Sequence, residues 1–257
     1  HRIAEGDKFG YDFALFENNI SAEFGLRYIV GQWALSADAV ISGERYYRKG
    51  YFEKELYAGA RSYGRSEKVK FSPYALRATL SYAIAPQHRL KLGLMHSATT
   101  PGDENLFLNP QYNNRVVDYP SLERIMATEV EYKYSSEKAD VILTAYYNSV
   151  RNQRQTVRMY DDLSRSYSDV DISRLGMVSY GVELASEVRF SSSLRASFSA
   201  AAGRYVYAEN PLVTIYADAD NSVISNHSTS YLGGCYIGGA PQVSASAEIT
   251  YLTYRGW

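Results

Sequence analysis

The chain has 257 residues, of which 25 are tyrosine, against nine phenylalanines and two tryptophans. Its 27 basic and 28 acidic side chains leave a formal net charge of −1, which argues against a nucleic-acid partner because general nucleic-acid binders carry a basic excess. The single cysteine, Cys235, excludes an internal disulfide framework and a zinc site built from several thiolates.

Alternation of apolar and polar side chains is the dominant pattern along the chain. In residues 20–30 the even positions are mostly apolar while the odd positions include Ser21, Glu23 and Arg27, and the pattern restarts after Gly31. A period of two is that of a β-strand, and no capped segment with a helical period interrupts it. The expected strands are 20–30, 33–41, 74–84, 90–96, 126–134, 139–147, 178–190, 194–202 and 243–251, with a further short one at 9–16.

The two faces of these expected strands differ in charge. One face carries no Asp, Glu, Lys or Arg, and its apolar positions include many alanines and tyrosines, which would fill a soluble core poorly. The strands also approach the 9–11 residues of a membrane β-strand. We expect the opposite face to line a lumen, with the charges Glu23, Arg27, Arg77, Glu129, Glu131, Glu183, Glu187 and Arg195 pointing into it.

The connections alternate between short and long. Short turns are expected at 31–32, 85–88, 135–138, 191–193 and 253–256, and long ones at 43–73, 97–123, 149–177 and 204–240. Outer-membrane barrels have this asymmetry, with tight periplasmic turns and long extracellular loops. Aromatic residues that we expect to form two girdles lie near the short turns (Tyr28, Trp33, Tyr82, Tyr134, Phe190, Tyr251) and at the other strand ends (Tyr74, Tyr147, Tyr180).

The sequence therefore predicts an all-β fold, a transmembrane antiparallel up-and-down β-barrel that sits in outer-membrane lipid. Nine clear strands is an odd number, whereas single-chain bacterial barrels usually have an even one, and the chain begins at His1 and stops at Trp257 just past an expected turn. We therefore expect residues 1–257 to be a contiguous part of one barrel domain. A soluble carbohydrate-binding β-domain remains a more distant alternative, because one buried face also produces alternation.

A series of short motifs resembles the late barrel of TonB-dependent outer-membrane receptors. In chain order they are Met-His-Ser-Ala-Thr-Thr-Pro at 95–101, Asn-Pro-Gln-Tyr-Asn-Asn at 109–114, Pro-Ser-Leu-Glu-Arg at 120–124, Thr-Glu-Val-Glu-Tyr-Lys-Tyr at 128–134, Leu-Thr-Ala-Tyr-Tyr at 143–147, Tyr-Gly-Val-Glu-Leu at 180–184 and Gly-Gly-Ala-Pro-Gln at 238–242. The resemblance implies a 22-stranded barrel with an N-terminal plug, and it places the plug, the early strands and the last strands outside this chain.

The same resemblance implies a function without catalysis. It indicates energised uptake of a scarce, bulky solute across the outer membrane of a Gram-negative bacterium, with the solute a siderophore, cobalamin, a glycan or a peptide. The implied partners are the TonB energy-coupling complex, acting through the plug, and in some cases a surface lipoprotein. The alternative is another outer-membrane barrel, such as a passive porin or an adhesin or translocation barrel.

Side chains that could contact a ligand are concentrated in the long connections. Tyrosine stacks on sugars and aromatic ligands, and arginine can bind carboxylates with two hydrogen bonds. The candidates are Arg45, Tyr46, Tyr47, Arg48, Arg61, Tyr63, Arg65, Tyr112, Asn114, Arg115, Arg151, Arg154, Tyr205 and Tyr207.

No cofactor, catalytic centre or metal site is predicted. The four histidines are scattered, and we expect His88 and His96 to be polar residues near the ends of strands. Asp218 and Asp220 resemble the start of a calcium loop but lack its glycine and closing glutamate, so we interpret them as part of an acidic loop. Asp169 and Asp171 are interpreted in the same way.

Overall fold

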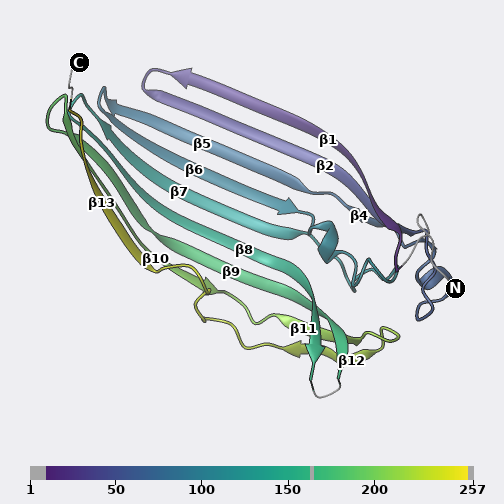
Figure 1. Cartoon of the computed structure of the whole chain (residues 1–257). Helices are drawn as coiled ribbons and strands as arrows, with labels where there is room; N and C mark the ends of the chain where they lie inside the picture. Colours follow the sequence, from purple (N-terminus) through teal and green to yellow (C-terminus); the bar gives the residue numbers. More distant parts are fainter. Residues whose placement is uncertain (1–9, 163–164, 254–257) are drawn as a thin grey trace.

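A computed structural model of the chain describes residues 10–162 and 165–253 as one curved antiparallel sheet (Figure 1). Its nine main strands follow the order β1-β2-β5-β6-β7-β8-β9-β10-β13, so each pairs with its neighbours along the chain. They are β1 (Phe13–Val30), β2 (Trp33–Gly50), β5 (Tyr74–Ala85), β6 (His88–Thr99), β7 (Glu123–Ser135), β8 (Ala139–Asp161), β9 (Ser166–Arg189), β10 (Leu194–Tyr207) and β13 (Val243–Tyr251). The predicted all-β, up-and-down antiparallel fold is confirmed.

Four short strands and two single-turn helices lie in the long connections. They are β3 (Gly64–Arg65), β4 (Val69–Phe71), β11 (Leu212–Ala217), β12 (Val223–Thr229), and the 3₁₀ helices η1 (Gly59–Arg61) and η2 (Asp103–Asn105). β3 and β4 pair with β2, and β11 pairs with both β9 and β12. Among the described residues, no helix has the length and apolar character needed to cross a membrane.

Several expected boundaries are wrong because strands continue where loops were expected. β2 runs to Gly50, inside the connection expected at 43–73, and β10 runs to Tyr207, inside that expected at 204–240. The segment 149–177 is mostly a paired ribbon, since β8 runs to Asp161 and β9 begins at Ser166. Beyond the two-faced region the ribbon no longer separates an apolar from a charged side, so alternation stops although backbone pairing continues. The separate strand expected at 9–16 is the beginning of β1, and Phe9 itself lies outside the described residues.

The predicted short turns are found at one end of the sheet, which we call the short-turn end. Gly31 begins the first turn with a φ of +57°, a left-handed conformation that glycine adopts without a steric penalty. The turn expected at 253–256 lies outside the described residues apart from Thr253. All long connections meet at the opposite end, called here the long-loop end (Figure 1).

The pairing register separates the charged and apolar side chains onto opposite faces. Asp38 pairs with Arg77, and Glu131 pairs with both Lys91 and Thr144, so these side chains project from the same side. The eight charges expected in a lumen all lie on this charged face. The expected girdle residues within the strands lie on the other face, near its two ends.

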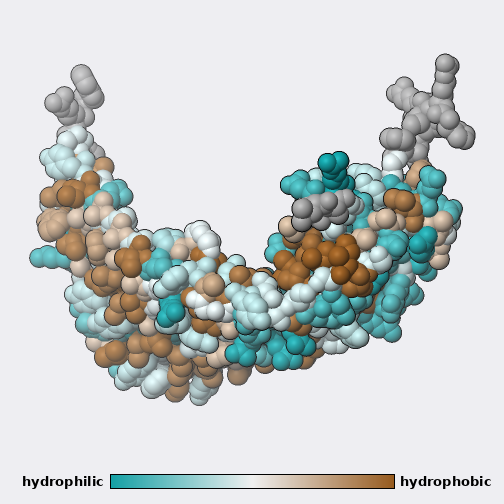
Figure 2. Space-filling view, turned by 90° about the horizontal axis from the view of Figure 1, so that it is seen from below, coloured by the Kyte–Doolittle hydropathy of each residue, from teal (hydrophilic) through white to brown (hydrophobic). Residues whose placement is uncertain are grey.

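The apolar face is exposed to its surroundings. Large side chains there include Ile20 at 78% exposure and Ile249 at 76%, far beyond the scattered single exposures of a soluble protein. Figure 2 shows a curved shell with hydrophobic patches spread over the half that carries the short turns, whereas the half at the long-loop end combines hydrophilic surface with a compact hydrophobic patch near the middle of the shell. The sheet has no second layer over its apolar face within the described ranges, which fits a wall facing lipid.

The buried core lies under the long loops and not along the sheet. Its centre consists of Tyr46, Val69, Phe71, Leu106 and Phe107. Tyr46 and Phe71 lie on the charged side of β2 and β4, where the segment 100–122 packs against them. This core fixes the loops at the mouth of the charged face and therefore shapes any site there.

Candidate functional site

A buried arginine holds the loops together at the long-loop end. Arg48, on the charged face of β2, is 1% exposed. Its Nε donates to the Pro110 carbonyl oxygen at 2.6 Å, and its Nη1 donates to the Ser62 carbonyl oxygen at 2.9 Å and to Asn114 Oδ1 at 2.5 Å. Burial lowers the pKa of Arg48 to about 10. The guanidinium therefore ties the segment after β2 to the segment before β7.

A second set of contacts joins those loops to the far side of the charged face. The Tyr57 hydroxyl donates to the Asp218 carbonyl oxygen, and burial raises the pKa of Tyr57 to about 12. Arg115 donates to the Asn221 carbonyl oxygen at 3.0 Å and lies over the Tyr216 ring, 4.7 Å from its centroid. Segments 51–68, 100–122 and 208–222 thus form one assembly, the loop layer.

A cleft opens at the long-loop end, partly within the loop layer. Its volume is about 520 Å³, and it lies between the segment before β7, the upper parts of β8 and β9, and the β11–β12 hairpin. The lining residues are Asp118, Tyr119, Ser121, Asn152, Arg154, Ser173, Arg174, Leu212 and His227. We call this the loop-end cleft.

Arg154 supplies a buried positive charge at the wall of the loop-end cleft. Its side chain is 9% exposed, and its Nε lies 3.1 Å from Asp171 Oδ1. Its Nη2 donates to the Asp118 carbonyl oxygen at 2.6 Å, while Nη1 is buried with no hydrogen-bond partner among the described residues. A buried guanidinium with one unused donor can bind an acidic or carbonyl oxygen of a ligand.

The backbone around the loop-end cleft is held in an uncommon conformation. Tyr119, Asn152, Arg174 and His227 have φ values between +49° and +58°, and they are four of the six non-glycine residues with positive φ in the part of the chain that the structure describes. Such positions cost about 1–3 kcal/mol each and persist where surrounding contacts fix them. Asn152 shows such contacts, since its Nδ2 donates to Ser121 Oγ at 2.9 Å and to the Leu122 carbonyl oxygen at 2.8 Å.

The positions of Asp169 and Asp171 show that one interpretation made from the sequence, an acidic loop, is wrong. Asp169 and Asp171 do not lie in an exposed acidic loop, because they belong to β9 and are 2% and 3% exposed. Burial raises the pKa of both carboxyl groups, and the charge of Arg154 opposes this effect at Asp171. Asp169 Oδ1 accepts a 3.4 Å hydrogen bond from Asn109, while its Oδ2 has no partner within the described ranges.

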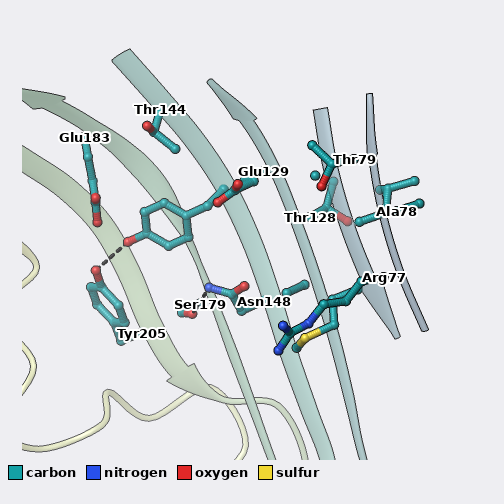
Figure 3. A pocket seen from close by; sticks show the side chains of 15 residues that line it. Arg77, Ala78, Thr79, Thr128, Glu129, Thr144, Asn148, Ser179, Glu183 and Tyr205 are labelled. Atoms are coloured by element: carbon teal, nitrogen blue, oxygen red, sulfur yellow. Dashed lines mark hydrogen bonds between the residues drawn. The ribbon is translucent and has the colours of Figure 1, made fainter. Parts of the chain in front are cut away.

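Farther toward the short-turn end, a second hollow of about 500 Å³ follows the charged face. Figure 3 shows Arg77, Glu129 and Tyr205 projecting into the same space from different strands. The Tyr205 hydroxyl forms a hydrogen bond with the Tyr146 hydroxyl, drawn as a dashed line. Lys91 pairs with Glu129 at 2.7 Å, so the charges of this wall partly neutralise one another.

Two paired glycines allow the Tyr146 side chain to lie across the sheet. Gly181 and Gly203 are direct partners in β9 and β10. A Cβ on Gly181 would lie 2.5 Å from the Ala202 carbonyl oxygen and 3.0 Å from the Tyr146 hydroxyl, and one on Gly203 would lie 2.8 Å from that hydroxyl. The close approach therefore requires residues without side chains at both positions.

The structure divides the predicted ligand residues among several environments. Five lie in the loop layer: Arg61, Tyr63, Tyr112, Asn114 and Arg115. Arg154 lines the loop-end cleft, and Arg151 is exposed with its Nε 3.9 Å from Glu209. Arg45 and Tyr47 project from the same side as the apolar face. Tyr46 is buried and donates to Glu17 and Glu44. Contact with a ligand stays a prediction for all of them.

Several residues of the cleft are absent from the sequence-based candidates. Tyr119 and Arg174 carry no motif, and His227 had been interpreted only as a scattered polar residue. Asp218 accepts a hydrogen bond from Arg158 at 2.7 Å, and Asp220 Oδ1 accepts one from the Ser222 amide, which accounts for both as loop contacts. Within residues 10–162 and 165–253, no group of three His, Cys, Asp or Glu side chains is arranged to hold a metal ion.

Comparisons with known proteins place the chain. Residues 6–257 match the family model described as "TonB dependent receptor-like, beta-barrel". No curated protein sequence matches the chain. Among 32 matching chains of solved structures is "Copper transporter OprC", with a TM-score of 0.58 and 12% identity. That alignment covers 78% of this chain and 32% of the transporter, so the chain spans about a third of it and the likeness shows the fold alone.

Proposed function

The chain belongs to the TonB-dependent receptor β-barrel family, and from this premise we propose that the full-length protein imports a scarce, bulky solute across the outer membrane of a Gram-negative bacterium. In this proposal the solute binds at the long-loop end, a plug closes the barrel below it, and the TonB complex supplies energy through that plug. The long-loop end faces outward from the cell, and the short-turn end faces the periplasm.

The observation that carries the proposal is the position of the loop-end cleft. It lies at the end of the sheet where the loop layer is assembled, beyond the two-faced part of β8 and β9. A ligand bound there would be accessible from outside the cell. Strained backbone positions that are held in place by neighbouring contacts often accompany ligand sites, which also supports the assignment.

The chemistry of the cleft favours a solute with an acidic group beside an aromatic or sugar ring. Arg154 offers a buried donor, and Arg174 and His227 stand exposed at the rim. Tyr119 is 84% exposed and can stack against a planar group. Siderophores, cobalamin, glycans and peptides all remain candidate solutes. Copper is not adopted from the named transporter, because 12% identity shows the fold alone.

An uptake experiment tests the proposal. A deletion of the full-length gene is grown on limiting iron-siderophore, cobalamin, glycan or peptide sources and compared with strains that carry the wild-type gene with and without a functional TonB. We expect one source to require both the receptor and TonB. Uptake that requires the receptor but continues without TonB would support a passive porin, and no difference on any source would contradict an uptake function.

Variants connect that phenotype to the cleft. Arg174→Ala and His227→Ala alter its rim without removing a buried group, whereas Arg124→Ala alters an exposed arginine outside it. We expect the first two to raise the solute concentration needed for half-maximal uptake by roughly tenfold, as the loss of about 1.4 kcal/mol of binding would do. Equal uptake by all three variants would contradict binding at the cleft and would indicate a binding site elsewhere in the loop layer.

A further inference from the structure

A basic cluster projects from the side of the sheet that carries the apolar face, above the apolar residues. Arg45 pairs directly with Lys70, and Lys49 pairs with Arg65, so two nearby register positions carry positive charges. Arg45, Arg65, Lys68 and Lys70 are exposed and line a hollow of about 640 Å³. We call these four residues the outer basic patch.

The patch begins where the apolar side chains end. Ile20 pairs with Gly43 and Ile41 pairs with Tyr74, and the next side chain beyond Gly43 on the same side of β2 is Arg45. Arg45 is four residues beyond Ile41, or about 13 Å along a strand. With the strand tilt of about 35–45° found in barrels, the height difference is about 10 Å. Arg45 and its partner Lys70 therefore lie just above the outermost apolar residues, whereas Arg65, which pairs with Lys49, lies about 20 Å above them by the same arithmetic.

Among the described residues, the four cations of the patch form no ion pair with a carboxylate, although Glu67 lies beside Lys68 in the sequence. Glu44 also lines the hollow, but its carboxylate already accepts hydrogen bonds from Asn19, Tyr46 and Thr100. The patch thus presents four cations with few internal partners.

Aromatic contacts fix the position of one of these cations, the Arg65 guanidinium. The Tyr47 ring stacks on Phe16 with centroids 4.8 Å apart, and the Arg65 guanidinium lies 5.5 Å from the Tyr47 centroid. A guanidinium packed over a ring keeps its edge free for hydrogen bonds. Arginine and lysine side chains are suited to phosphate, since the guanidinium can bind two oxygens and the ammonium provides a point charge.

We propose that the outer basic patch binds the phosphate groups of the glycolipid that forms the outer leaflet of the outer membrane. This inference rests on the membrane placement in the proposed function but not on solute uptake. The patch lies along β2, β3 and β4 and shares no lining residue with the loop-end cleft, so the proposed lipid site is separate from the solute site. Bound glycolipid would neutralise the cations and fix the height of the barrel in the membrane.

Binding of purified lipid A to the full-length protein in detergent tests this proposal. The patch variant carries Arg45→Gln, Arg65→Gln, Lys68→Gln and Lys70→Gln. The matched control neutralises the same number of cations on the charged face near the short turns, and it carries Arg27→Gln, Arg89→Gln, Lys133→Gln and Arg195→Gln. Circular dichroism and thermal melting establish that both variants retain the fold.

We expect the patch variant to bind bisphosphorylated lipid A at least roughly tenfold more weakly than wild type, and the control variant to bind within about twofold of it. Monophosphoryl lipid A should bind wild type more weakly, and micelles with phosphatidylglycerol should show a smaller dependence on the patch. Equal affinity of the patch variant and wild type would overturn the proposal. So would equal losses in both variants, or an equal patch effect with phosphatidylglycerol.

The outcome separates this proposal from that of solute uptake. Lipid A binding that depends on the patch in a protein with no TonB-dependent uptake would refute the transport function and leave the lipid site standing. TonB-dependent uptake by a protein whose lipid A binding is unchanged in the patch variant would refute the lipid site and leave the transport function standing. Higher salt should weaken the wild-type interaction, because exposed charges are screened within about 10 Å at 0.1 M ionic strength.

Discussion

Replacing Arg48 with methionine should loosen the loop layer while leaving the sheet intact. The guanidinium makes three hydrogen bonds, to Pro110, Ser62 and Asn114, in a site where it is 1% exposed. Hydrogen bonds to charged groups contribute roughly 1.5–3 kcal/mol each, and desolvation of the buried cation offsets part of the sum. We expect the opening free energy of the loop layer to fall by about 3 kcal/mol, which corresponds to a factor of roughly 100 in its opening equilibrium.

Hydrogen exchange of the full-length protein in detergent measures this change. Amides in 51–68 and 102–122 should exchange roughly 100-fold faster in Arg48→Met, and those in β6 and β7 should be unchanged. Arg124→Met, which removes an exposed arginine at the same end, should leave the loop amides as in wild type. Combining Arg48→Met with Asn114→Ala should cost less than the sum of the two changes, because they share a hydrogen bond. Unchanged exchange in Arg48→Met would refute the role of this residue.

Two further substitutions probe burial and close approach. Burial raises the pKa of Asp169 in the folded protein, so ionising this carboxyl group destabilises the fold. The stability is lost progressively as pH rises from about 4 through the raised pKa. Asp169→Asn should therefore slow hydrogen exchange in β9 at pH 7 and change it little at pH 4. Slower exchange at pH 4 alone would contradict this sign. Gly181→Ala should destabilise the barrel by about 1–3 kcal/mol, because the new methyl group would clash with the Ala202 carbonyl oxygen. Gly238→Ala is the control, since an added Cβ there has no atom within 4 Å. Equal melting temperatures for the two variants would refute the clash.

Alternation predicts the barrel wall well because each strand there separates two different environments. The parity of Asp38 and Arg77 already placed them on one face, and the register pairs them directly. The same parity, continued from Ile41, places Arg45 and Tyr47 on the side of the apolar face and Tyr46 and Arg48 on the other. That signal was present in the sequence, although the four residues were treated as one set of loop candidates.

The loop-end cleft could not be derived in this way. Residues 151–161 are largely polar and were expected to form a loop, because outside the two-faced region β-pairing leaves no periodic pattern. Asp171 is buried only because the segment before β7 and the β11–β12 hairpin pack near β9, and Tyr119 and His227 line one cleft although they lie far apart in the sequence. Contacts between such distant segments depend on the assembled loop layer and not on local composition.

Transport through this barrel requires the sheet to be a membrane wall with lipid on one face and water on the other. Spin labels placed singly at positions 90–95 of β6, in full-length protein carrying Cys235→Ser and reconstituted in bilayers, test this directly. Labels at the even positions Leu90, Leu92 and Leu94 should be relaxed mainly by oxygen, which concentrates in lipid, and those at Lys91, Gly93 and Met95 mainly by a water-soluble nickel complex. Accessibility that does not alternate with a period of two would contradict the barrel wall and the transport function built on it.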